Sequence, residues 1–105
     1  MKKILIIGGG AMGSAFTIPC IENKNKVTIT EPYSKTFIKD LSSKNKFHSS
    51  LKINLPKSLK FRNFSLNLLS EKFDLIVIAL SLTGIDFIGK ELKKLKVKTP
   101  ILVLT

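Results

Sequence analysis

The sequence predicts an α/β protein built on one doubly wound parallel sheet, and three observations support this fold. Short, unbroken apolar runs rich in Ile, Leu and Val recur along the chain, as expected for strands buried on both faces of a sheet. Stretches with apolar residues spaced three and four apart lie between these runs and are typical of helices. A run of three glycines joins the first predicted strand to the first predicted helix. Strands that alternate with helices in this way form a parallel sheet covered on both faces.

The predicted strands share a continuous or alternating apolar pattern and lie at residues 3–7, 27–30, 59–62, 73–79 and 101–104. The third of them alternates apolar with basic residues, which favours a place near an edge of the sheet. We expect the five strands to adopt the Rossmann-like order 3-2-1-4-5.

The first predicted helix begins at Ala11 and ends in the polar residues 23–26. Its expected buried face consists of apolar residues at helical spacing: Met12, Ala15, Phe16 and Ile18. Pro19 lacks a backbone N–H and its ring clashes with the preceding turn, so we expect a kink at this residue.

The remaining segments complete the alternation. Ser34 is a candidate cap for a helix at 35–43, and residues 63–72 are expected to form a short helix or turn. An amphipathic helix follows the fourth strand, and its apolar face carries Ile85, Ile88, Leu92 and Leu95. Residues 44–56 are polar and weakly patterned, so we expect a loop there.

Length and composition exclude several classes of protein. A chain of 105 residues allows one domain with one modest core. Its longest apolar runs, at 4–7 and 75–82, are far shorter than the roughly 20 residues that span a bilayer. The single cysteine, Cys20, excludes an intramolecular disulfide and a multi-cysteine metal site, and it is expected to be a small core residue. A reducing, cytoplasmic location is the simplest interpretation.

The charge is strongly basic, because 18 Lys and Arg residues oppose 7 Asp and Glu residues and give a formal net charge of +11. Basic surfaces bind nucleic acid, but Arg62 is the only arginine and the lysines are scattered along the chain. These two features argue against a nucleic-acid partner. The alternative is a positive field that attracts small phosphorylated ligands.

The residues that carry chemistry lie in the run Gly8-Gly-Gly-Ala-Met-Gly13, which fits G-x-G-x-x-G between a strand and a helix. Gly8 permits the tight turn, Gly10 lets the backbone approach a pyrophosphate, and Gly13 lets the helix pack closely on the strand. The N–H groups at the start of the helix are expected to bind the phosphates, with help from the helix dipole. The predicted ligand is therefore a dinucleotide cofactor.

Glu31 supplies the second feature of such a site, since it follows the second strand, 18 residues after Gly13. A carboxylate at this position accepts hydrogen bonds from the ribose hydroxyls and repels a 2′-phosphate. NAD is therefore the expected cofactor. NADP stays open, because Lys35 is close enough in sequence to reduce the repulsion.

The other candidates are less informative. Ser81 follows the fourth strand, where an open α/β sheet meets its ligand, and it is either a cofactor contact or a helix cap. His48 has no second histidine or cysteine to form a metal site, and we expect it to be solvated. The chain shows no paired carboxylates and no Ser/His/Asp arrangement, so no catalytic residue and no metal ligand is predicted.

Three matches resemble the N-terminal half of NAD(P)-dependent glycerol-3-phosphate dehydrogenase. They are the glycine run extended to Phe16, Ala79-Leu-Ser81 followed by Thr83-Gly-Ile, and Pro100-Ile-Leu-Val-Leu-Thr105. The resemblance implies reversible hydride transfer between a nicotinamide cofactor and glycerol 3-phosphate or dihydroxyacetone phosphate. It also implies that Ala11 and Met12 flank the pyrophosphate and that Ser81 lies near the cofactor.

In that family a Lys-Gly motif and a helical C-terminal domain follow the last of these segments. The resemblance therefore implies that residues 1–105 are a truncated dinucleotide-binding domain, inactive alone, which meets its phosphorylated three-carbon substrate only with the second domain. Apolar surface that such a domain leaves exposed favours a homodimer. The alternatives are the same domain of a ketopantoate reductase or a 3-hydroxyacid dehydrogenase, or a non-enzymatic module that senses dinucleotides or binds nucleic acid.

Overall fold

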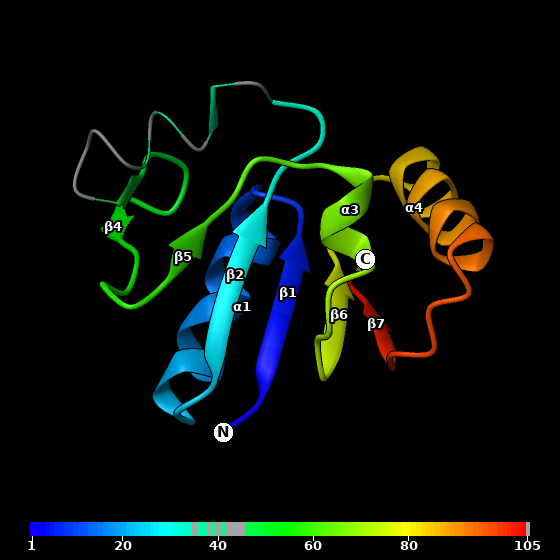
Figure 1. Cartoon of the computed structure of the whole chain (residues 1–105). Helices are drawn as coiled ribbons and strands as arrows, with labels where there is room; N and C mark the ends of the chain where they lie inside the picture. The colour runs from blue at the N-terminus through cyan, green and yellow to red at the C-terminus, as the bar shows by residue number, and fades with distance from the viewer. Residues whose placement is uncertain (35, 38, 40, 42–45, 105) are drawn as a thin grey trace.

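The structure is a computed structural model that describes residues 1–34, 36, 37, 39, 41 and 46–104. Its centre is a parallel sheet in the order β5-β2-β1-β6-β7 (Figure 1). The strands are β1 (Lys3–Ile7), β2 (Lys26–Thr30), β5 (Lys60–Phe61), β6 (Leu75–Ile78) and β7 (Ile101–Val103). When the five strands of this sheet are numbered in chain order, their order in the sheet is 3-2-1-4-5, so the predicted topology is confirmed.

The central strand β1 pairs with β2 on one side and with β6 on the other. Ile7 is the partner of Thr30 in β2 and of Ile78 in β6. The three strands therefore end at the same level, and the segments that follow them meet at the carboxyl edge of the sheet. In a doubly wound sheet this is the edge that binds ligands.

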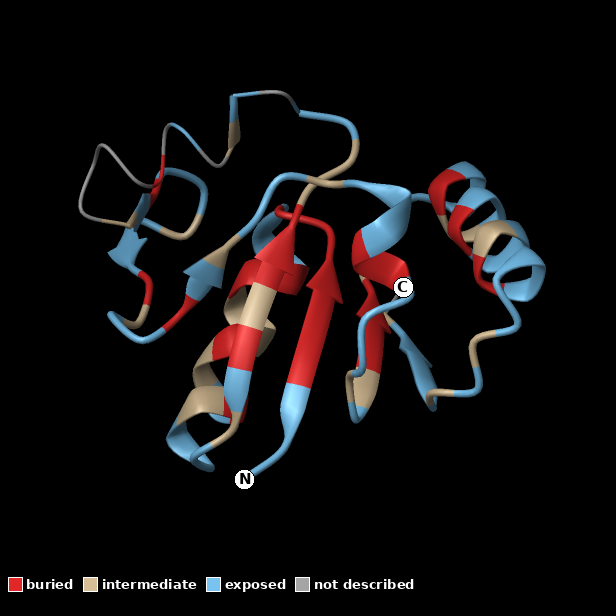
Figure 2. Ribbon diagram, in the orientation of Figure 1, coloured by how far each residue is buried: buried red, intermediate tan, exposed pale blue. Residues whose placement is uncertain are grey.

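Helices cover both faces of the sheet, as predicted (Figure 1). The helix α1 (Ala11–Glu22) covers one face, and its Cys20 packs in a cluster with Ile4, Ile6, Val27 and Ile29. The helices α3 (Leu66–Leu69) and α4 (Leu82–Lys94) cover the other face. There Leu68 and Ile88 pack with Leu5 and Ile7. Figure 2 shows the buried residues concentrated in β1, β2, β6 and the inner faces of the helices.

The predicted buried face of the first helix is wrong except for Phe16, which is partly buried and packs against the core. The buried residues of α1 are small or polar, namely Gly13, Ser14, Thr17 and Cys20, whereas Met12 is 50% exposed. The small side chains let the helix lie close to the sheet. The hydroxyls of Ser14 and Thr17 are satisfied inside, because each donates to a backbone carbonyl. The helix also continues past Pro19 as far as Glu22.

The segment between β2 and β5 departs from the prediction. The expected helix at 35–43 lies largely outside the described residues. The expected loop at 44–56 contains an antiparallel pair, β3 (Phe47–His48) and β4 (Ile53–Asn54). Strands of two residues are too short to show a periodic pattern in the sequence, and only tertiary contacts stabilise them.

Candidate dinucleotide-binding site

The glycine loop between β1 and α1 is held against the neighbouring strands. The N–H of Gly8 donates to the carbonyl of Thr30 at 2.8 Å. Gly8 has a φ of +127°, and an added Cβ would lie 2.2 Å from the carbonyl oxygen of Ala79. A Cβ at Gly13 would lie 2.2 Å from the carbonyl oxygen of Gly8. Glycine is required at both positions, because the turn and the helix approach backbone atoms directly.

Gly10 differs from these two glycines. It is the N-cap of α1, and a Cβ added to it would meet none of the described atoms within 4 Å. Its surroundings therefore do not require a glycine. The first N–H groups of a helix have no partner within the helix. Among the described residues no side chain caps this end, and Ala11 and Met12 are exposed. The start of α1 therefore presents backbone N–H groups that no described side chain caps, at the positive end of the helix dipole.

Glu31 lies directly after β2 and reaches the glycine loop. One carboxylate oxygen accepts the N–H of Gly9 at 2.7 Å, and the other accepts the N–H of Tyr33 at the same distance. A carboxylate has about four lone-pair sites, so both oxygens can still accept further hydrogen bonds. The structure thus brings Glu31 and the glycine loop together at the carboxyl edge of the sheet.

A buried hydroxyl lies at the same edge. Thr30 is fully buried, and its Oγ1 has no hydrogen-bond partner among the described residues. A buried hydroxyl without a partner costs free energy, and a bound ligand or an ordered water would supply one. Together with the space above Gly10, this hydroxyl is consistent with a ligand site at the end of β2.

Ser81 follows β6 and starts α4. Its Oγ accepts the N–H of Gly84 at 3.4 Å, which makes it the N-cap of this helix. Tyr33 extends from the loop after β2 toward the same helix, since an added Cβ at Gly84 would lie 3.0 Å from the Tyr33 ring. The loops after β2 and β6 therefore approach each other at the sheet edge. The capping interpretation of Ser81 has a geometric basis, whereas a cofactor contact stays a prediction.

The sequence interpretation made no prediction for Gly9 and was wrong about His48. Gly9 occupies a position that the motif G-x-G-x-x-G leaves open, yet an added Cβ would lie 2.5 Å from the Phe37 ring. His48 was expected to be solvated, but it is only 6% exposed, and its Nε2 lies 2.9 Å from the carbonyl oxygen of Gly9. The correction has a tertiary cause, because the pairing of β3 with β4 places His48 against the glycine loop. The lone histidine of a polar segment carries no sequence signal for this contact.

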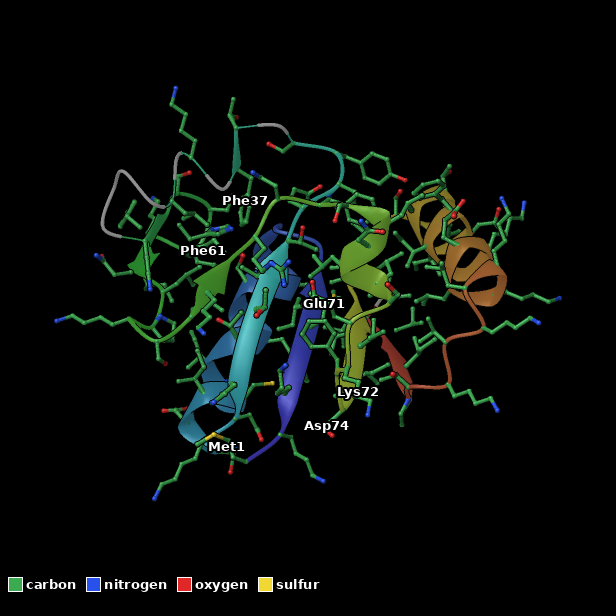
Figure 3. The ribbon with its side chains drawn as sticks, viewed as in Figure 1. Met1, Phe37, Phe61, Glu71, Lys72 and Asp74 are labelled. Carbon is green, nitrogen blue, oxygen red and sulfur yellow. The ribbon has the colours of Figure 1, made fainter. Side chains whose placement is uncertain are left out.

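Two further features affect the pKa values of side chains: the burial of Cys20 and the ion pair between Arg62 and Glu71. Cys20 is buried, as predicted, and burial raises the pKa of its thiol. Arg62 forms a bidentate ion pair with Glu71, with N–O distances of 2.6 and 2.8 Å. The hydrogen bond from Arg62 lowers the pKa of Glu71. The single arginine is therefore already paired. Figure 3 shows Glu71 in front of the sheet, whereas Phe37 lies near the carboxyl edge. The described residues contain no cluster of metal-ligating side chains.

The fold and the glycine loop define a Rossmann-type dinucleotide-binding domain. The family model of the NAD-dependent glycerol-3-phosphate dehydrogenase N-terminus matches residues 3–105. The chain belongs to this family, as the sequence resemblance predicted. The family is one of NAD-dependent dehydrogenases, and the structural neighbours include dehydrogenases, one of them solved with NADH. No curated protein matches the chain significantly.

Solved structures share the fold. Glycerol-3-phosphate dehydrogenase from Coxiella burnetii matches with a TM-score of 0.73 and 21% identity over 97% of this chain and 31% of its own. A protein assigned as a 2-dehydropantoate 2-reductase, from Enterococcus faecalis, matches with a TM-score of 0.69 and 24% identity over 98% and 33%. D-mandelate dehydrogenase in complex with NADH and anilino(oxo)acetate matches with a TM-score of 0.68 and 20% identity over 97% and 33%. The chain thus spans about a third of each neighbour. None of the helices that the structure describes is long and apolar enough to cross a membrane.

Proposed function

We propose that residues 1–105 bind NAD for a dehydrogenase that interconverts glycerol 3-phosphate and dihydroxyacetone phosphate. The open N-terminus of α1 beside the glycine loop carries this proposal, since it offers unpaired backbone donors to a pyrophosphate. When bound, the nicotinamide ring supplies the hydride acceptor or donor. The residues of this chain bind and orient the cofactor.

The phosphates are held by the backbone. The N–H groups of Gly10, Ala11 and Met12 lie at the positive end of the helix dipole and donate to the pyrophosphate oxygens. The absence of a side chain at Gly10 leaves room for the phosphates to approach the backbone. Gly8 and Gly13 have a different role, because they set the position of the loop against α1 and against Ala79, directly after β6.

The adenosine ribose is held by Glu31. Its two carboxylate oxygens each accept one backbone N–H and have capacity for the ribose hydroxyls. A 2′-phosphate would meet this negative charge, and Arg62, which could otherwise neutralise the phosphate, is paired with Glu71. Lys35 lies outside the described residues. These contacts support NAD as the cofactor in preference to NADP.

Ser81 completes the cofactor side of the site in this proposal. Its oxygen caps α4 while its O–H remains available to donate, because a hydroxyl both donates and accepts. Substrate binding and hydride transfer belong to the complete enzyme, since the structural neighbours are about three times as long as this chain. We expect no turnover from residues 1–105 alone. We expect the domain to function in the cytoplasm, because a chain with a single cysteine suits a reducing compartment.

Calorimetric titration with NADH and then NADPH, at low and high salt, tests the proposal. We expect NADH to bind more tightly than NADPH. Binding of neither cofactor would refute the proposed site, and tighter NADPH binding would refute the role of Glu31. Retention of DNA that decreases steeply with salt, without cofactor binding, would instead support a nucleic-acid module.

The second candidate substrate class is 2-dehydropantoate, favoured by the likeness to the reductase from Enterococcus faecalis. The polypeptide that contains this domain should be assayed with both substrates. Oxidation of NADH with dihydroxyacetone phosphate and not with 2-dehydropantoate is the expected result. The reverse preference would keep the cofactor proposal and replace the substrate.

A further inference from the structure

His48 is buried against the glycine loop, although 39 residues separate it from Gly9. The carbonyl oxygen of Gly9 can only accept a hydrogen bond, so the Nε2 of His48, 2.9 Å away, must carry a proton and donate. The Nδ1 of the same ring accepts a hydrogen bond from the N–H of Leu51 at 3.3 Å and must therefore be unprotonated. The two contacts together assign the neutral Nε2–H tautomer.

Gly9 is held on both sides of its backbone. Its carbonyl oxygen accepts hydrogen bonds from the hydroxyl of Ser14, at 3.0 Å, and from the imidazole of His48. These two bonds occupy both lone pairs of the carbonyl oxygen. Its N–H donates to Glu31. The loop residue is thus held from α1, from β3 and from the end of β2, which removes the conformational freedom that glycine would otherwise have.

The direction of the Gly9 carbonyl determines the direction of the next N–H group. The Gly9–Gly10 peptide bond is trans, and in a trans peptide the carbonyl and the following N–H point in opposite directions. A carbonyl held toward His48 therefore turns the N–H of Gly10 away from β3. This is an N–H at the open start of α1, where a phosphate would bind.

We propose that His48 is a positioning residue of the dinucleotide site: by binding the Gly9 carbonyl it holds the Gly10 N–H ready for the pyrophosphate. The proposal rests on the proposed cofactor function. Phe37 supports the arrangement, since its ring meets the His48 ring edge-on, with the ring centroids 6.4 Å apart, and packs against Gly9. The segment from Lys46 to Leu55, which carries β3 and β4, thereby becomes part of the cofactor site.

Three substitutions separate the hydrogen bond from the packing. His48→Gln keeps an N–H donor near the place of Nε2, whereas His48→Asn reaches only as far as Nδ1. His48→Phe keeps a ring against Phe37 but has no donor. One hydrogen bond contributes about 1 kcal/mol, so the Asn and Phe variants should bind NADH roughly five- to tenfold more weakly. The Gln variant should stay within about threefold of the wild type, as should Ser49→Ala, an exposed control in the same turn.

Adenosine provides the control ligand, because it lacks the phosphates. Its affinity should be the same in the wild type and in all His48 variants. Equal NADH affinity in the wild type, Asn and Phe variants would overturn the proposal. So would an equal loss of NADH and adenosine binding, which indicates a general loss of structure. If the His48→Phe protein does not fold, the NADH affinities of His48→Gln and His48→Asn still test the proposal.

A second measurement does not depend on the cofactor. His48 is the only histidine of the chain, so a long-range ¹H–¹⁵N spectrum shows a single imidazole. We expect the Nε2–H tautomer at neutral pH and a shifted Gly10 amide signal in the Asn variant but not in the Gln variant. The opposite tautomer, or an unchanged Gly10 signal, would overturn the positioning role. If these signals are as expected but the wild type binds no NADH, the cofactor proposal fails, and with it the functional part of this inference.

Discussion

At the scale of single residues, the glycines of the loop differ in what surrounds each of them. Gly8 combines a positive φ with contact to the backbone of Ala79, directly after β6, and Gly13 contacts the loop itself. Gly10 has no described atom within 4 Å of an added Cβ, and this open space suits the approach of a ligand. Gly9 contacts an aromatic ring. The motif G-x-G-x-x-G records only the first three, because Phe37 reaches Gly9 through the tertiary fold.

Gly8→Ala should destabilise the domain by at least about 2 kcal/mol, because the new Cβ is strained at positive φ and overlaps the Ala79 carbonyl. Gly89→Ala is the matched control. Gly89 lies inside α4 with no described atom within 4 Å of an added Cβ, so alanine there should stabilise by up to about 1 kcal/mol. Urea denaturation measures both. A Gly8→Ala protein as stable as the wild type would contradict the geometry of the turn.

Glu31→Gln should change cofactor preference, because it removes the negative charge near the expected 2′-position. We expect NADH to bind several-fold more weakly and NADPH more tightly, so that the ratio of their affinities changes by about tenfold. Calorimetry with both cofactors measures the ratio. Glu22→Gln, at the exposed end of α1, should leave it unchanged. An unchanged ratio in the Glu31 variant would show that this carboxylate does not select the cofactor.

At the scale of elements, residue patterning and tertiary packing contribute differently. The strands β1 and β6 are apolar in almost every position because both of their faces are covered, and the sequence therefore predicts them directly. The strand β2 alternates apolar residues with threonines, and this pattern also predicts a strand. The helix α1 is not readable in the same way. It buries a small, partly polar face so that it can approach the sheet, and hydrophobic periodicity points to the wrong side. The sequence does predict the buried face of α4, since Ile88 and Leu92 are buried as expected, although Leu95 lies just after the helix and is 41% exposed.

The ion pair between Arg62 and Glu71 joins the segment after β5 to the segment after α3. The folded state lowers the pKa of Glu71, so the pair stabilises the fold above the ordinary titration range of glutamate. This stabilisation is lost as the pH falls through the lowered pKa. Glu71→Gln should therefore be less stable than the wild type at pH 7 and equally stable in strong acid. Both groups are exposed, so the difference should be small and should decrease with salt.

Denaturation at several pH values checks this expectation. Asp86→Asn is the control, because it removes one carboxylate of another exposed ion pair, Asp86–Lys90 at 3.1 Å in α4, and leaves the pair between Arg62 and Glu71 intact. A Glu71 variant whose stability follows the wild type at every pH would show that the pair contributes nothing.

At the scale of the whole molecule, the sheet ends in an exposed apolar strand. Ile101, Leu102 and Val103 of β7 are 39–45% exposed, and β7 is the last strand in the sheet order (Figure 2). An edge strand with exposed apolar side chains presents unpaired backbone groups to another chain. A second copy of the chain can pair with this edge, which is the physical basis of the predicted homodimer.

Light scattering over a range of concentrations tests the dimer. We expect residues 1–105 to associate as concentration rises and Leu102→Lys to remain monomeric, because a lysine in β7 opposes pairing of two identical edges. Lys98→Gln, which lies before the strand, should associate like the wild type. A monomeric wild type at all concentrations would refute the homodimer.

The sequence by itself determined the order of strands and helices, the strand order of the sheet, the glycine turn and the family. These features depend on local patterns: apolar runs, helical spacing, and glycines placed between a strand and a helix. Only the tertiary structure decided which face α1 buries, that residues 47–54 form a strand pair, and that His48 and Phe37 pack against Gly9. Such contacts join residues far apart in the chain, and their partners leave no periodic signal in the sequence.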